Sequence, residues 1–243
     1  MVVEVTGCSG AGKSSLVQEI QRLAREHGLR IATPPDVLLP RTPRAIVRNP
    51  TLQNLAFDLA GACRALPARR RYRSFLAFAR AMIRREGDGL ITALNAYRSV
   101  LRTVGIHKAL SRTTCSATIL VDEGTVQSAH LILAHVKRPA RLEDIHTFSH
   151  VVPMPDLIVH VAAPLETVLA RTFARPDPPL WYRSREENER FVRHAHAMFD
   201  QLLRHEPFSC NTLKVNCEDD GWQQYRIHAR AVIERIAQRR PGA

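Results

Sequence analysis

The sequence predicts an α/β fold in which a parallel sheet of about five strands carries helices on both faces. Short apolar runs alternate with longer segments whose apolar residues recur at helical spacing. The runs at residues 117–121 and 156–161 are almost continuously apolar, which is typical of strands buried on both faces of a parallel sheet. A chain of 243 residues fits one domain, so we expect residues 1–243 to form a single unit.

The order of the elements follows from the same patterns. Helical spacing begins at Leu16, directly after the first strand and a glycine-rich stretch. Residues 51–112 show no strand pattern, and we therefore expect a helical insertion at about 34–112. A proline-rich loop at 175–179 interrupts the later helices. Strands are expected at residues 2–6, 29–33, 117–121, 156–161 and 212–215, and later helices at 126–136, 164–171, 186–204 and 222–239.

Composition narrows the class of protein without identifying a partner. Hydrophobic residues make up 45% and charged residues 24%, which is typical of a globular chain. The net charge of +12 would attract nucleic acid, an anionic membrane surface or phosphorylated molecules, and charge alone leaves these open. The five cysteines lack the paired spacing of a zinc site or a disulfide framework. No segment approaches 18 apolar residues, so we expect a soluble, cytoplasmic protein with no membrane partner.

The glycine-rich stretch at residues 7–14 fits the pattern G-x-x-x-x-G-K-[ST], between a predicted strand and a predicted helix. Glycines let backbone N–H groups converge on phosphate oxygens, and the helix N-terminus adds a partial positive charge. The pattern predicts binding of ATP with Mg²⁺, in which Lys13 reaches the β and γ phosphates and the Ser14 hydroxyl ligates the metal. The other predicted binding residues of this phosphate loop are Gly7, Ser9, Gly10, Ala11, Gly12 and Ser15.

Two carboxylates, Asp122 and Glu123, follow the apolar run at 117–121. They are expected at the carboxyl edge of the sheet, where ligands bind in open α/β folds. One carboxylate can hold Mg²⁺ through water, for which we expect Asp122, while the other accepts a proton from the attacking group. The sequence leaves open which of the two is the base.

The phosphate loop, the strand at 119–122 and the strand at 155–161 followed by Arg171-x-x-x-Arg175 resemble the thymidylate kinase and nucleoside kinase group of P-loop kinases. The resemblance implies a three-layer P-loop NTPase fold with a lid at about 171–185. It also implies that Arg171 and Arg175 clamp the transferring phosphoryl group. Guanidinium groups suit that task, because phosphoryl transfer spreads negative charge over equatorial oxygens. An ordinary solvated helix end is the alternative.

The sequence departs from thymidylate kinases at Glu123, where that family has an arginine that touches the phosphate of the acceptor. A carboxylate would repel a phosphate, so we expect a neutral or cationic acceptor that offers a hydroxyl group. The helical insertion should line its pocket, with Asp36, Arg98 and Arg102 as candidates from chain position. A homodimer through the insertion is plausible by analogy alone.

The leading interpretation is an ATP- and Mg²⁺-dependent kinase acting on a nucleoside, a sugar or a related metabolite. The alternative is a P-loop ATPase that couples hydrolysis to a partner or nucleic acid, with the glutamate orienting water. An arginine-rich stretch between Asp58 and Glu86 fits a solvated helix face, which we favour, or an anionic partner such as nucleic acid. Its members are Arg64, Arg69, Arg70, Arg71, Arg73, Arg80, Arg84 and Arg85.

Overall fold

A five-stranded, entirely parallel sheet forms the centre of the chain in the order β2-β3-β1-β4-β5, which confirms the predicted α/β class. The computed structural model describes residues 1–38, 70–87, 89–113, 117–176, 179–180, 183–218 and 221–239. Val2 in the central strand pairs with Ile119 on one side, and Val3 pairs with Leu157 on the other. The strands are β1 (Val2–Thr6), β2 (Ile31–Ala32), β3 (Thr118–Asp122), β4 (Leu157–Ala162) and β5 (Thr212–Asn216).

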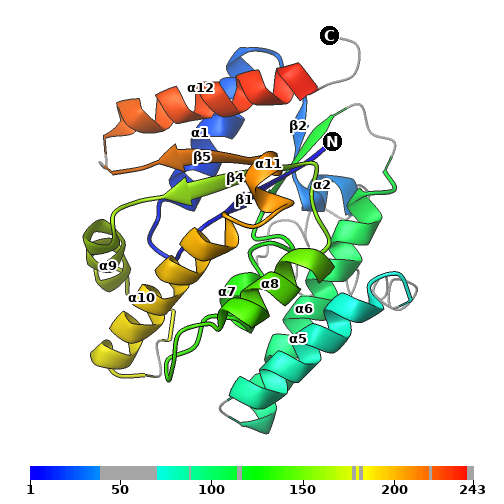
Figure 1. Cartoon of the computed structure of the whole chain (residues 1–243). Helices are drawn as coiled ribbons and strands as arrows, with labels where there is room; N and C mark the ends of the chain where they lie inside the picture. Colours follow the sequence, from blue (N-terminus) through cyan, green and yellow to red (C-terminus); the bar gives the residue numbers. More distant parts are fainter. Residues whose placement is uncertain are drawn as a thin grey trace, which may run out of the picture.

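Helices cover both faces of the sheet, as a parallel sheet requires. Figure 1 shows α1 and α12 on one side, and α5, α6, α7, α8 and α10 on the other. The first pair is α1 (Lys13–Glu26) and α12 (Trp222–Arg239). The second group is α5 (Arg73–Glu86), α6 (Leu90–Leu110), α7 (Ala129–Ile132), α8 (Leu142–Val151) and α10 (Arg185–Leu202). Three further helices are α2 (Pro34–Leu38), α9 (Leu165–Phe173) and α11 (Phe208–Asn211).

The central strand separates two parts of the core, because successive side chains of a strand point to opposite faces. Val3 and Val5 belong to the cluster that includes Leu16 and Ile20 of α1. Val2 belongs to a different cluster with residues of α2, α6 and β3. Each fully buried side chain of this size contributes roughly 1.5–3 kcal/mol through burial of apolar area. The phosphate loop is therefore anchored at the end of the most enclosed strand.

The helix predicted at 126–136 is wrong in its extent. Only Ala129–Ile132 is helical, and a separate helix, α8, begins at Leu142. Pro139 removes a backbone donor between the two, and the acidic Glu143 and Asp144 in the first turn of α8 favour a new helix start there. The second strand is also shorter than predicted, because Pro34 begins α2 instead of extending the ladder.

The described parts of the predicted insertion are helical, in α2, α5 and α6. Residues 39–69 and 88 lie outside the described residues, together with Arg64 and Arg69, so the full insertion stays a prediction. Among the described cysteines, Cys8, Cys210 and Cys217 are free thiols. No helix in the described part of the chain is long and apolar enough to span a bilayer.

Candidate active site

The phosphate loop leads into α1 through a left-handed turn at Gly12, which is the N-cap residue with φ +99°. A Cβ atom at this position would lie 2.4 Å from the Tyr225 hydroxyl oxygen, so both the backbone conformation and the space require glycine. The first turn of α1 contains no acidic residue. The positive end of the helix is therefore available to an anion.

The side chain of Lys13 folds back over the phosphate loop. It is 9% exposed, and its Nζ donates to the carbonyl oxygens of Gly7 at 3.0 Å and Cys8 at 3.1 Å. Burial lowers the pKa of Lys13, while the opposite charge of Glu123 acts to raise it. A buried ammonium held by carbonyl groups is a ready partner for a phosphate oxygen, whose charge would compensate for its desolvation.

A cavity of about 280 Å³ lies over the phosphate loop and collects residues from three separate segments. They come from the loop and the start of α1, from the chain after β3, and from the chain after α9. The loop residues Gly7, Ala11 and Ser15 do not line it. The lining residues are Ser9, Gly10, Gly12, Lys13, Ser14, Glu123, Gln127, His130, Arg175 and Pro179. We call this the phosphate cavity.

The two predicted carboxylates differ in where they lie. Glu123 lines the phosphate cavity, whereas Asp122 lines a smaller cavity beside it. Burial and the neighbouring charge of Glu123 raise the pKa of Asp122. Glu123 has a φ of +63°, a left-handed conformation that is strained for a residue with a Cβ atom and that concentrates at functional sites. Glu123 is thus the carboxylate that faces the phosphate loop.

The arginines of the R-x-x-x-R segment also separate. Arg175 lines the phosphate cavity. Arg171 instead donates from Nη1 to the carbonyl oxygen of Cys217 at 3.0 Å and from Nη2 to that of Glu218 at 3.5 Å. It ties the end of α9 to the segment after β5, and its part in a phosphoryl clamp stays a prediction. Of the expected lid, residues 177–178 and 181–182 lie outside the described residues.

Sequence reasoning missed two residues of the phosphate cavity, Gln127 and His130. The Oε1 atom of Gln127 accepts hydrogen bonds from Thr6 Oγ1 at 2.8 Å and from the Gly7 amide at 3.0 Å. The ring of His130 stands edge-on to Phe191, with centroids 4.9 Å apart, and burial lowers its pKa to about 3. Their spacing of three residues just after the strand-end carboxylates is the signal that would have indicated a shared face.

The oxygen donors at the phosphate cavity fit Mg²⁺. Mg²⁺ prefers a few oxygen ligands and keeps several waters, and it is usually completed by substrate phosphates. The Ser14 hydroxyl and the Glu123 carboxylate line the cavity, and Asp122 is adjacent. Among the described residues, no group of three or more His, Cys, Asp or Glu side chains is arranged to hold a metal on its own. This donor set suits a metal whose remaining ligands come from a phosphate-bearing molecule.

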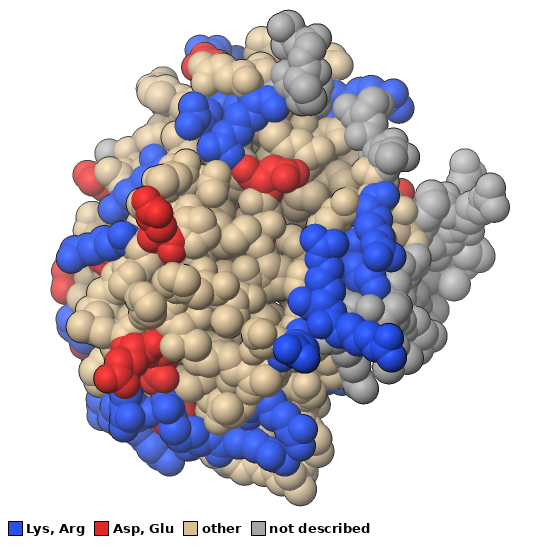
Figure 2. Space-filling view, turned by 45° about the vertical axis from the view of Figure 1, so that its right-hand side comes forward, with Lys and Arg blue, Asp and Glu red and all other residues tan. Residues whose placement is uncertain are grey.

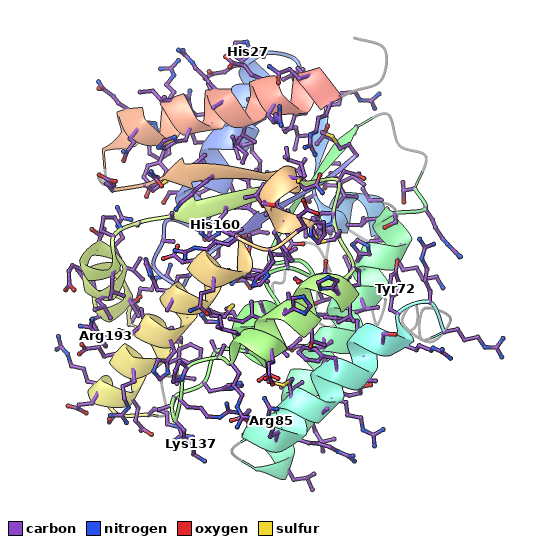
Figure 3. All side chains as sticks on the ribbon, in the orientation of Figure 1. His27, Tyr72, Arg85, Lys137, His160 and Arg193 are labelled. Atoms are coloured by element: carbon purple, nitrogen blue, oxygen red, sulfur yellow. The ribbon has the colours of Figure 1, made fainter. Side chains whose placement is uncertain are left out.

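Two further cavities adjoin the phosphate cavity. The larger, of about 510 Å³, is bounded by α5, α6, α7 and α10 and shares His130 and Pro179 with it. The smaller, of about 190 Å³, shares Glu123 with it. Lys137 lines the larger cavity and lies at the same end of the molecule as Arg85 (Figure 3). Glu86, also in its lining, is ion-paired with Arg85 and Arg138.

The three residues expected to bind the acceptor are placed apart from the larger cavity. Arg102 lines the smaller cavity. Asp36 is exposed, and its Oδ2 accepts hydrogen bonds from the backbone amide and the hydroxyl of Thr33, both at 2.7 Å. Arg98 lies exposed on α6. A role for these three residues in acceptor binding stays a prediction.

No protein-family model matches the sequence. No curated protein matches it either. The fold resembles deoxyadenosine kinase from M. mycoides with dATP bound, at 12% identity and a TM-score of 0.44, over 96% of this chain and 100% of the kinase. The same kinase with the products dCMP and a flexible dCDP bound gives 13% identity and a TM-score of 0.47, over 99% and 100%. A protein of Thermus thermophilus has 17% identity and a TM-score of 0.44, over 99% of this chain and 98% of that protein. These are likenesses of fold alone.

Proposed function

We propose that this chain is a kinase that transfers the γ-phosphoryl group of ATP, with Mg²⁺, to a hydroxyl group of a small molecule such as a nucleoside, a sugar or a related metabolite. The observation that carries the proposal is the junction of two cavities. The phosphate cavity is lined by two cationic side chains and a carboxylate, and it shares His130 and Pro179 with a second cavity of about 510 Å³. That volume lies within the range of sites for small molecules.

The proposed roles follow from the positions of the side chains. Lys13 and the N-terminus of α1 bind the β and γ phosphates, and Ser14 and Asp122 would hold Mg²⁺, which would neutralise phosphate charge. Glu123 accepts the proton of the acceptor hydroxyl while the oxygen of that hydroxyl forms a bond to the γ-phosphorus. The bond from that phosphorus to the bridging oxygen breaks, and ADP leaves. Arg175 neutralises charge on the transferred group.

We place the acceptor in the larger cavity. Its lining has an apolar part formed by Ala93 and Ala96 on α6 and by Ala134 just after α7. The phosphate cavity, with which it shares His130 and Pro179, is lined by Glu123, which disfavours an acceptor phosphate there. A molecule with an apolar body and a neutral or cationic hydroxyl-bearing end fits both features.

Hydrolysis is the principal rival, because Glu123 in the same place would also orient a water molecule. The adjoining cavity favours transfer, since a hydrolase needs no space for a second substrate. A nucleic-acid partner is less favoured. Figure 2 shows Lys and Arg gathered in separate groups on one face of the molecule, and the described arginines of the 64–85 stretch are exposed. The opposite side of α5 is buried in the core, as for an ordinary amphipathic surface helix.

The test is ATP turnover with Mg²⁺, alone and with a panel of nucleosides, sugars and hydroxylated metabolites. We expect negligible turnover until one acceptor is added, and loss of that turnover in Lys13→Ala and Glu123→Gln. Ala96→Phe fills the larger cavity and should raise the KM for the acceptor with little change in the KM for ATP. Ala81→Phe, on the exposed side of α5, is its matched control. Acceptor-independent hydrolysis abolished by both active-site changes would establish the ATPase instead.

A further inference from the structure

Glu4 is a carboxylate in the middle of the central strand, where its neighbours in sequence are apolar. It is 2% exposed and lies on β1, between β3 and β4 (Figure 1). Val3 and Val5 point toward α1 and α12, so Glu4 points to the opposite face. A buried carboxylate is costly unless several donors compensate for its lost hydration. The fold must therefore supply partners for it.

Those partners come from the segment that follows the strand-end carboxylates. The backbone N–H of Gln127 donates to Glu4 Oε1 at 2.7 Å, and the Thr125 hydroxyl lies 3.4 Å from Oε2. The backbone amides of Gly124 and Val126 also act to lower the pKa of Glu4, which favours its charged form. A Cβ atom at Gly124 would lie 2.4 Å from Glu4 Oε2, so only glycine permits this approach. The Glu4 carboxylate thus interacts with the whole segment 124–127.

One residue of the phosphate cavity lies directly before segment 124–127, and another is its last residue. Glu123, directly before it, holds the strained φ of +63°. Gln127, the last residue of the segment, lines the cavity, and its Oε1 accepts hydrogen bonds from the Gly7 backbone amide and the Thr6 hydroxyl. The contacts therefore run without a break from Glu4 to the segment, and from the segment to the phosphate loop.

We infer that Glu4 is a positioning residue whose carboxylate holds segment 124–127, so that Glu123 and Gln127 keep their places against the phosphates. Its effect on turnover rests on the proposed kinase function, whereas its effect on the segment does not. Burial raises the pKa of Glu4 to about 7, and the backbone donors of the segment act in the opposite direction by favouring the carboxylate. The segment and the carboxylate therefore stabilise each other.

The chain offers a matched control in Glu19. This carboxylate also has a fully buried side chain, but it lies on α1 and pairs with Arg22. Neither residue lines the phosphate cavity. Glu19→Gln therefore makes the same chemical change in a buried glutamate without touching the segment, and it separates a positioning role from a general loss of stability.

The experiment measures hydrogen–deuterium exchange and steady-state kinetics in the wild type, Glu4→Gln and Glu19→Gln. In Glu4→Gln we expect the amides of 124, 126 and 127 to exchange at least about 10-fold faster, while those of β4 stay unchanged. We expect kcat to fall about 10- to 100-fold, with a much smaller change in the KM for ATP, as is typical when the support of a functional group is removed. Glu19→Gln should show neither effect. If Glu4→Gln does not fold, Glu4→Asp, which keeps the charge but shortens the reach, takes its place.

Adding ATP and Mg²⁺ separates this inference from the proposed function. The nucleotide should slow exchange of the segment in the wild type and much less so in Glu4→Gln, whether or not any phosphoryl group is transferred. Unchanged exchange of the segment in Glu4→Gln would overturn the inference. A loosened segment with full turnover and full protection by ATP would also overturn it, and would leave Glu4 a structural residue only. Absent turnover in the wild type would sink the kinase proposal alone.

Discussion

Replacing Glu123 by glycine should stabilise the protein while removing its activity. The left-handed φ of +63° at Glu123 costs a residue with a Cβ atom roughly 1–2 kcal/mol. Glycine adopts it freely but loses about 0.5–1 kcal/mol more backbone entropy on folding. The difference leaves a net gain of up to about 1.5 kcal/mol, and each 1 kcal/mol corresponds to a rise in Tm of roughly 2–4 °C for a chain of this size. Loss of the carboxylate that faces the phosphate loop should abolish acceptor-dependent turnover.

The same substitution one residue earlier supplies the control, because Asp122 is the last residue of the extended strand β3. Asp122→Gly gives up entropy with no strain to relieve, so it should lower stability by about 0.5–1 kcal/mol. Glu123→Gln keeps the strained backbone and should leave Tm nearly unchanged while turnover falls. Thermal and urea denaturation measure all three variants beside turnover. A Tm for Glu123→Gly as low as that of Asp122→Gly would refute the assignment of strain.

The structure predicts the direction of three further effects on stability, two from substitutions and one from pH. Gly12→Ala should cost about 2 kcal/mol of stability, because of the left-handed φ and the contact with Tyr225. Adding Tyr225→Phe should restore part of that stability, measured by urea denaturation. No recovery would contradict the contact. Ser184→Ala breaks a capping box with Glu187 at the start of α10, and should cost about 1 kcal/mol and raise the KM for the acceptor. Burial also lowers the pKa of several histidines well below 6.5, so they are neutral when folded and take up protons when unfolded. The free energy of unfolding is therefore highest above pH 6.5. It falls as the pH drops toward about 4 and then 3, by up to roughly 1.4 kcal/mol per histidine per pH unit. Equal unfolding midpoints at pH 7 and pH 5 would contradict this. These histidines are His107, with a pKa of about 4, and His130 and His160, each with a pKa of about 3.

Local pattern predicted the sheet and the glycine turn from β1 into α1 well, because strand burial and glycine spacing depend on a few consecutive residues. The predicted strand at 2–6 matches β1, and the predicted helix at 222–239 matches α12. The contact between Glu4 and Gln127 was not predictable in this way. A lone acidic residue in a strand reads as solvent-facing, and its partners lie more than a hundred residues away along the chain.

The separation of Arg171 from Arg175 has a similar cause. Their spacing of four residues places both on one side of a continuous helix, but α9 ends at Phe173 and the chain turns before Arg175. The Cys217 carbonyl oxygen that accepts the hydrogen bond from Arg171 lies just after β5, far away along the chain. Acceptor residues chosen by chain position were subject to the same difficulty, since α5, α6, α7 and α10 meet around the larger cavity only after folding.

The pairing of the first strand with the third also bears on how the protein is made. Val2 can pair with Ile119 only after the residues between them have been synthesised. At a synthesis rate of roughly 5–20 residues per second, the strand therefore stays unpaired for about 6–23 s. An apolar, β-branched segment without a partner is prone to join other chains, and a charge within it opposes that association. Glu4 is the charged residue of β1. The carboxylate that is costly within the folded sheet should therefore oppose aggregation of the nascent strand before the sheet forms.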